Sequence, residues 1–223
     1  MLIAGNWKLN CNLKGAIQLS SSIFDILNKN KVLSEVALFP PIIYIDTIKK
    51  MNKNSNISIG AQDCSKNVSG AYTGEVSATM LLDIGCKYVI VGHSERRNGN
   101  HESNQDIFLK AKNVIDNKMI PIICVGESLK DREAGNALQF IESQLKESIP
   151  TNKNNNEFII AYEPIWAIGS GKIPTIDSIN EMLNMIRQWL LNNGISNNTK
   201  ILYGGSVNKD NTKELFSCKN LGG

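Results

Sequence analysis

Four polar side chains stand where short apolar runs of this sequence end, which is where a parallel α/β sheet opens to solvent. The runs and the side chains that follow them are 2–5 with Lys8, 88–91 with His93, 158–162 with Glu163, and 200–203 with Ser206. Runs of this length, bounded by Pro and Gly, are typical of buried strands. If these strands are parallel, their carboxyl ends meet on one face, and the four side chains converge there.

A carboxylate, an imidazole and an ammonium group on one face favour proton abstraction next to a carbonyl group. Glu163 would take a C–H proton, His93 would polarise the carbonyl oxygen, and Lys8 would stabilise the developing enediolate. Each residue alone is a weak signal, because most lysines are solvated charges and most histidines are structural. His101, the second of the two histidines, lies in a polar run and is interpreted as structural.

Two glycine-rich turns, at 169–171 and 204–206, suggest that backbone amides hold a phosphate or another anion. Neither turn matches a dinucleotide-binding or Walker pattern, so the sequence gives no direct support for a nucleotide. The five cysteines are scattered without metal-ligand spacing, so we expect reduced thiols, no metal and no cofactor. The chemistry must then be one that side chains perform unaided.

Seven alternations of strand and helix position these residues, and they predict one all-parallel α/β domain. The remaining expected strands are 36–39, 57–61 and 120–125, and the longest expected helix is 176–193, with Asp177 as its N-cap and Gly194 just past its end. A net charge of +3 without a basic cluster argues against nucleic acid as a partner. We expect neither a signal peptide nor a membrane span, and a cytoplasmic location.

Six blocks of this sequence resemble the signature sequences of the triosephosphate isomerase family, in the family's order and at similar spacing. They are AGNWKLN at 4–10, GAYTGEVSATML at 70–81, VGHSERR at 91–97, ICVGES at 123–128, AYEPIWAIGSGK at 161–172 and YGGSV at 203–207. The resemblance implies a TIM (β/α)8 barrel and a homodimer without metal or cofactor. The implied activity is interconversion of dihydroxyacetone phosphate and D-glyceraldehyde 3-phosphate, in glycolysis and gluconeogenesis.

The resemblance also implies a role for each matching residue. Glu163 matches the catalytic base, His93 matches a neutral electrophile, and Lys8 matches the cation that neutralises substrate charge. The implied substrate-binding residues are Asn6, Lys8, Gly169 and Ser206, the glycine and the serine being phosphate contacts.

Other blocks carry implied roles outside the catalytic set. Glu95 fits a second polar partner near the lysine, and residues 164–174 match a mobile lid. The loop 70–75, from Gly70 to Glu75, matches the loop that enters the neighbouring subunit, with Thr73 at its tip.

Three departures from the family pattern put parts of this prediction in doubt. Cys11 stands where the family usually has glycine, and Ile173 and Pro174 form an unusual pair at the end of the lid. No apolar run follows the seventh helix, so the eighth β/α unit is missing from the expected fold, which we interpret as one barrel domain that is incomplete at its C-terminus.

Gly222 and Gly223 fit the turn before an eighth strand better than a phosphate-binding pair. Two alternatives to the isomerase remain open. One is a different phosphosugar enzyme, and the other is a truncated barrel of weak or no activity that only binds phosphate ligands.

Overall fold

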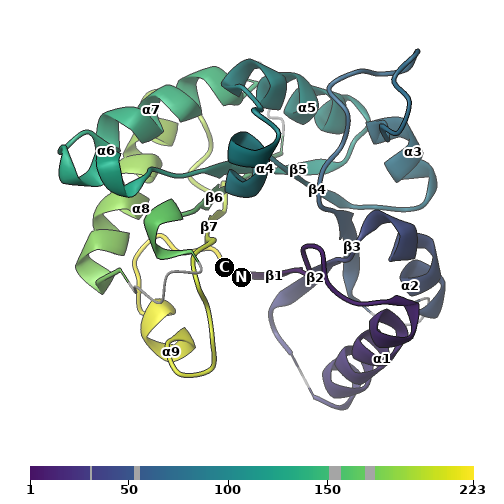
Figure 1. Ribbon diagram of the computed structural model, residues 1–223. Coiled ribbons are helices and arrows are strands. Elements are labelled where there is room, and N and C mark those ends of the chain that lie inside the picture. The colour runs from purple at the N-terminus through teal and green to yellow at the C-terminus, as the bar shows by residue number, and fades with distance from the viewer. Residues whose placement is uncertain (31, 53–55, 151–156, 169–173) are drawn as a thin grey trace.

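The computed structural model describes residues 1–223 except residues 31, 53–55, 151–156 and 169–173, and its described part forms a curved parallel sheet surrounded by helices (Figure 1). Seven strands pair in chain order within this part. They are β1 (Leu2–Asn6), β2 (Glu35–Phe39), β3 (Ser58–Ala61), β4 (Tyr88–Val91), β5 (Ile120–Val125), β6 (Ile159–Tyr162) and β7 (Ile201–Tyr203). All six pairings are parallel, so the predicted strand–helix alternation is confirmed.

The helices of the described residues lie outside the strands. They are α1 (Leu13–Lys29), α2 (Ile45–Met51), α3 (Ala78–Asp83), α4 (Ser94–Gly99), α5 (Asn104–Asp116), α6 (Leu129–Glu133), α7 (Ala137–Ser148), α8 (Ile176–Asn192) and α9 (Thr212–Leu215), with 3₁₀ turns η1 (Ile42–Tyr44) and η2 (Ile165–Ala167). None of these helices combines the length and the apolar character that crossing a bilayer requires.

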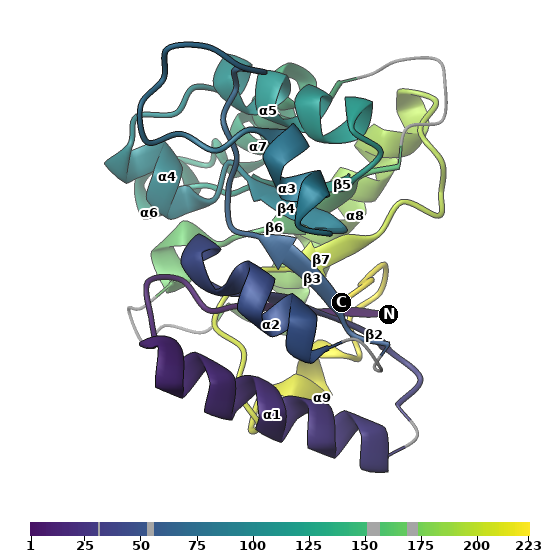
Figure 2. The same ribbon diagram turned by 90° about the vertical axis from the view of Figure 1, so that its right-hand side faces the viewer.

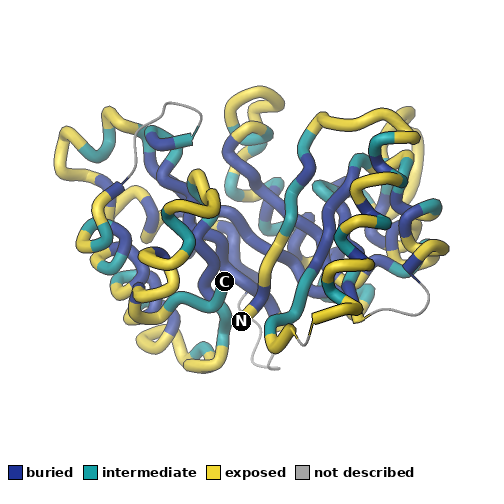
Figure 3. Tube along the Cα trace, turned by 90° about the horizontal axis from the view of Figure 1, so that it is seen from below, coloured by how far each residue is buried: buried dark blue, intermediate teal, exposed yellow. Residues whose placement is uncertain are grey.

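Alternation along each strand divides the buried side chains between two cores. One set packs between the strands and the helices, and the other fills the interior of the curved sheet. In Figure 3 most of the buried segments, in dark blue, lie toward the middle of the molecule, and the outer turns of the helices on either side are exposed. Gly60 on β3 makes room for the interior set, because a Cβ there would lie 2.3 Å from the ring of Phe39.

The last two residues lie between β7 and β1, where the two ends of the chain meet (Figure 1). Leu2 N–H donates to the carbonyl of Gly222 (2.8 Å), Gly222 N–H donates to Ile201 O (2.7 Å), and Tyr203 N–H donates to Gly223 O (2.9 Å). Gly222 and Gly223 therefore pair with β7 on one side and with the start of β1 on the other. No described helix covers the sector between α1 and α9, and Ile3 on β1 is 38% exposed.

The structure departs from the sequence prediction in three helices. Asp177 is not the N-cap of α8, because Thr175 holds that position and its hydroxyl accepts from Ser178 N–H. Asp177 lies one residue inside the helix, where its charge still complements the helix dipole. The short helices α4 and α6 were not expected, since neither has an apolar stripe; α6 instead begins at a capping box of Ser128 and Asp131.

A polar cluster closes the interior at the amino ends of the strands. Its centre is Glu35, whose carboxylate accepts from Lys87 Nζ (2.6 Å) and Tyr88 OH (2.6 Å) and lies 3.4 Å from Lys200 Nζ. These partners come from the starts of β4 and β7, so the cluster links β2 to both strands. Figure 2 shows the fold from the side on which α1, α2 and α3 lie in front of the strands. Burial alone would raise the pKa of Glu35, but the hydrogen bonds from Lys87 and Tyr88 and the charges of both lysines lower it from 4.5 to about 2.

This shift predicts an acid-sensitive contribution to stability. Because the pKa of Glu35 is lower in the folded than in the unfolded chain, its contribution is complete above about pH 4.5 and is lost as the pH falls toward 2. We expect Glu35→Gln to lower the free energy of unfolding in urea at pH 7 by about 1 kcal/mol, since these pairs are partly solvated, and by less at pH 3. Glu142→Gln, at an exposed site on α7, is the control. An equal loss for Glu35→Gln at both pH values would contradict the assignment.

Candidate active site

A cavity of about 610 Å³ opens at the carboxyl ends of the strands. Its walls include every predicted site residue that the structure describes: Asn6, Lys8, His93, Glu163 and Ser206. Interior side chains such as Ile90, Ile122 and Leu202 form its apolar floor. The convergence predicted for four of these residues is therefore present, and Asn6 joins them. Gly169 and Ile173 lie outside the described residues.

Glu163 is the buried centre of this cavity. It follows β6 directly and is only 3% exposed. Its Oε1 lies 3.2 Å from His93 Nε2, and its Oε2 accepts from the backbone N–H of Ser94 at 2.9 Å. Burying a carboxylate is unfavourable unless it is hydrogen-bonded. The Ser94 N–H supplies a hydrogen bond to one oxygen, and the His93 ring lies beside the other.

The tautomer of His93 follows from its second ring nitrogen. His93 is the N-cap of α4, and its Nδ1 accepts from the backbone N–H of Glu95 at 3.2 Å. A nitrogen that accepts a hydrogen bond carries no proton, so a neutral His93 holds its proton on Nε2. Nε2 lies 3.2 Å from Glu163 Oε1, which places the imidazole and the carboxylate side by side in the cavity.

Lys8 is held in an unusual backbone conformation, with a φ of +51°. The side chain of Asn6 accepts from Lys8 N–H (3.0 Å), and the Gln62 amide donates both to Lys8 O (2.9 Å) and to Phe39 O (2.8 Å). These bonds offset the strain of a left-handed residue that is not glycine. The ammonium group of Lys8 reaches Glu95 Oε1 at 2.5 Å.

Two glycines let the backbone close around Glu163. A Cβ at Gly126 would lie 1.9 Å from the carbonyl oxygen of Glu163, and one at Gly204 would lie 2.9 Å from its Cγ. Any side chain at Gly126 would displace the base. The sequence analysis did not identify Gly126, Gln62 or Ser94 as site residues, although Gly126 follows an expected strand directly.

The cavity wall also contains a thiol. Cys124 is buried beside Glu163, and burial together with the Glu163 charge raises the pKa of the thiol well above its ordinary value. A thiol that stays protonated is a poor nucleophile. Cys124 is thus part of the wall, and it gives no support for covalent catalysis.

Ser206 lies at the rim of the cavity. Its hydroxyl donates to the carbonyl of Ala167 at 3.3 Å and so ties the loop after β7 to η2. The fully buried carboxylate of Glu127 holds the other side of η2, because it accepts from Trp166 Nε1 (2.8 Å) and Tyr162 OH (3.1 Å). The segment that follows Glu163 is therefore fixed as far as Ala167.

Within the described residues, no group of three or more His, Cys, Asp or Glu side chains is placed to hold a metal ion. What these residues offer is a buried carboxylate, an imidazole whose Nε2 lies beside it, and an ammonium group. Such a set can remove a proton from carbon and place it back, with the imidazole bonded to the neighbouring oxygen.

Comparisons with known proteins agree with this chemistry. The family model for triosephosphate isomerase matches residues 1–223. The triosephosphate isomerase of Lactobacillus delbrueckii subsp. bulgaricus is 42% identical over 228 residues, and that of Vibrio sp. (strain ANT-300) is 40% identical over 227 residues. Both alignments cover 100% of this chain and 90% of the relative. The crystal structure of triosephosphate isomerase from Bartonella henselae matches with a TM-score of 0.89 at 31% identity, over 100% of this chain and 90% of that one.

The geometry of His93 predicts its nuclear magnetic resonance spectrum. With nitrogen-15 labelling, we expect the imidazole of His93 to show a protonated Nε2 and an unprotonated Nδ1 at neutral pH, because Glu95 N–H occupies Nδ1. His101 is exposed and serves as the internal reference. A proton on Nδ1 of His93 would show that the bond from Glu95 does not form.

Proposed function

The chain belongs to the triosephosphate isomerase family, and we propose that it interconverts dihydroxyacetone phosphate and D-glyceraldehyde 3-phosphate in this cavity. The reaction belongs to glycolysis and gluconeogenesis. The observation that carries the assignment of roles is the buried pair of Glu163 and His93, in which Oε1 of the carboxylate lies 3.2 Å from Nε2 of the imidazole. This pair offers a base and an electrophile to adjacent atoms of one small substrate.

In the proposed mechanism Glu163 takes the proton from the carbon next to the carbonyl group. The electron pair of that C–H bond forms the enediolate, and Nε2–H of His93 donates a hydrogen bond to the oxygen where negative charge develops. The same carboxylate returns the proton to the neighbouring carbon. The hydroxyl proton of the substrate moves from one of its two oxygens to the other, next to the imidazole. A neutral histidine in this role is an established property of the triosephosphate isomerase family, and the bond from Glu95 N–H to Nδ1 supports it here.

Lys8 is the proposed partner of the substrate's negative charge, with Asn6 bracing it. In the described structure its ammonium group is paired with Glu95, whose side chain is more than half exposed. Ser206 and Gly169 are the proposed phosphate contacts. Ser206 is suitably placed at the cavity rim, and Gly169 rests on the family resemblance alone.

The test is a coupled assay of glyceraldehyde 3-phosphate isomerisation. We expect turnover by the chain itself, and a fall in kcat of about 100-fold in Glu163→Asp, because the shorter side chain withdraws the carboxylate by about 1 Å. His93→Asn removes the electrophile and should lower kcat by about 100-fold as well. His101→Asn is the matched control, since asparagine tolerates the left-handed backbone at that exposed site (φ +55°).

Full activity in both Glu163→Asp and His93→Asn would overturn the roles assigned here. Absence of turnover in the unaltered chain, with phosphate-analogue binding retained, would instead favour a barrel that only binds ligands.

A homodimer is the proposed assembly, with the loop from Gly70 to Glu75 entering the partner subunit. Internal bonds hold this loop in shape: Glu75 N–H donates to Tyr72 O (3.1 Å), and the Ser65 hydroxyl bonds to the Glu75 carboxylate. Tyr72 is nevertheless 49% exposed, and Leu9 on a nearby loop is 98% exposed. Exposed apolar side chains on braced loops support a protein–protein contact.

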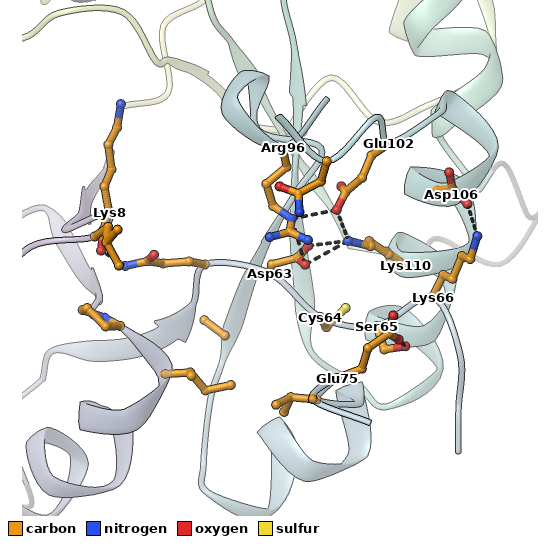
Figure 4. Close-up of a pocket in the computed structure, with 18 residues that line it drawn as sticks. Lys8, Asp63, Cys64, Ser65, Lys66, Glu75, Arg96, Glu102, Asp106 and Lys110 are labelled. Carbon is orange, nitrogen blue, oxygen red and sulfur yellow. Dashed lines mark hydrogen bonds and ion pairs between the residues drawn. The ribbon is translucent and has the colours of Figure 1, made fainter. Parts of the chain in front are cut away.

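The base of this loop borders a second cavity of about 580 Å³, shown in Figure 4. Its floor is a cluster of four charged groups in which Lys110 Nζ contacts Asp63 (2.7 Å) and Glu102 (2.6 Å), and Arg96 Nε contacts Glu102 at 2.7 Å. Burial raises the pKa of Asp63, and the charge of Lys110 partly offsets this rise. A cavity of this kind beside the loop is a suitable receptor for the same loop of a second copy.

Substitution at the loop tip tests the dimer. We expect Tyr72→Asp to shift the sedimentation coefficient from that of a dimer to that of a monomer, because it places a charge in an apolar contact. Phe216→Asp is the control, since Phe216 is also an exposed aromatic side chain (45%) but belongs to the opposite end of the chain. Dissociation by Phe216→Asp alone would place the interface elsewhere.

The cytoplasm is the proposed location. All five cysteines are free in the structure, and four of them are buried. Unpaired thiols in this number are usual in a reducing compartment.

A further inference from the structure

We propose that Arg97 is a positioning residue for the isomerisation: its guanidinium group fixes α4 to the ends of β4 and β5, and α4 in turn orients Glu163 and His93. The inference rests on the proposed function, and it concerns a residue that touches neither the substrate nor the reacting atoms.

The guanidinium group of Arg97 makes three hydrogen bonds, each to a different segment. Nε donates to Gly92 O (2.9 Å), one terminal nitrogen donates to Cys124 O (3.0 Å), and the other donates to Asn104 Oδ1 (2.6 Å). The first acceptor follows β4, the second belongs to β5, and the third starts α5. One rigid planar group thus joins two strand ends to a helix.

The two carbonyl groups flank the catalytic pair. Gly92 directly precedes His93 and has a φ of +72°, and a Cβ there would lie 2.7 Å from Ile107. Cys124 lines the cavity beside Glu163. Carbonyl groups at strand ends have lost their neighbours in the sheet and need another donor when buried. Arg97 supplies that donor to both, which fixes the turn from which His93 projects.

Through its backbone, Arg97 belongs to the helix that holds both catalytic side chains. Its N–H donates to the carbonyl of His93 at 3.0 Å, within the first turn of α4. The same turn provides Ser94 N–H to Glu163 and Glu95 N–H to His93 Nδ1. A small rotation of α4 would therefore move the Ser94 N–H away from Glu163 and turn the His93 ring with the helix.

A six-residue helix does not hold such a position by itself. Isolated helices this short are unstable in water, so packing and side-chain contacts must fix α4. Burial lowers the pKa of Arg97, and the charges of Glu163 and Glu102 partly offset this. None of the three acceptors is charged, so the arrangement serves geometry rather than ion pairing. Lysine has one ammonium group in place of the planar fork and cannot reach all three acceptors.

Arg187 on α8 is a matched control. Its two terminal nitrogens also donate to two backbone carbonyls, Asn197 O (2.9 Å) and Thr199 O (2.8 Å). Arg187 is buried, whereas Arg97 is half-buried. These contacts join α8 to the loop before β7, at the amino ends of the strands. Arg187→Lys should therefore disturb folding as Arg97→Lys does, without reaching the cavity.

The experiment compares the two lysine variants under conditions in which circular dichroism shows both to be folded. We expect Arg97→Lys to lower kcat by about 30-fold to 100-fold, as displaced catalytic groups do. KM should change by less than about threefold, because Lys8 and Ser206 are untouched. Arg187→Lys should keep kcat within about twofold of the original value. In labelled protein, the His93 imidazole signals should shift in Arg97→Lys and stay in place in Arg187→Lys.

Equal kcat values for the two variants, or unchanged His93 signals in Arg97→Lys, would overturn the inference.

If Arg97→Lys does not fold, Asn104→Ala replaces it. The alanine variant releases one guanidinium nitrogen of Arg97 and leaves both of its bonds to carbonyl groups. It should lower kcat by about fivefold with the same shift of His93 signals, and a kcat equal to the original would sink the proposal. Should the original chain show no turnover, the proposed function fails, while the His93 signals still decide whether Arg97 positions α4.

Discussion

The bond between the Glu163 carboxylate and the first backbone N–H of α4 is the contact on which the arrangement of this site depends. Glu163 follows β6, whereas Ser94 and His93 follow β4, and β5 lies between these strands. The two segments can meet because β5 is followed by Gly126, where a Cβ would collide with the Glu163 carbonyl oxygen. A buried carboxylate needs donors for both oxygens, so this contact fixes the start of α4 and the direction of the His93 ring together.

Curvature of the sheet brings the remaining groups to the same cavity. Asn6 and Lys8 follow β1, at one end of the strand order, and Ser206 follows β7, at the other. Within the described residues, Gly222 and Gly223 bridge these two ends near the starts of the strands, and the ion pair of Glu35 with Lys200 spans the same opening. Contacts at the amino ends of the strands therefore set the spacing of catalytic groups at their carboxyl ends.

The sequence predicted the strands and the face where the polar residues meet, because alternation of apolar runs and turns is a local signal. Residue type and position also suggested proton abstraction by Glu163, with His93 and Lys8 assisting. The reaction itself, and the roles of Asn6 and Gly169, came from the resemblance of six blocks to a known family. Helix α4 was not predicted, since its residues carry no apolar periodicity and it is held by contacts with distant segments. The bond from Ser94 to Glu163 joins residues 69 positions apart, and the bond from Arg97 to Cys124 joins residues 27 apart. Such pairings depend on how the strands are ordered, which no short window of sequence contains.

In the described structure the groups assigned to catalysis are in contact with other side chains. Glu163 faces the imidazole of His93, and Lys8 faces Glu95. Under the proposed roles, a substrate must replace both contacts, taking the Nε2–H of His93 for its oxygen and the ammonium group of Lys8 for its charge. Each exchange trades one charge-assisted contact for another, so it adds little to ground-state affinity. The gain comes when negative charge reaches the oxygen in the transition state, and that difference is what accelerates a reaction.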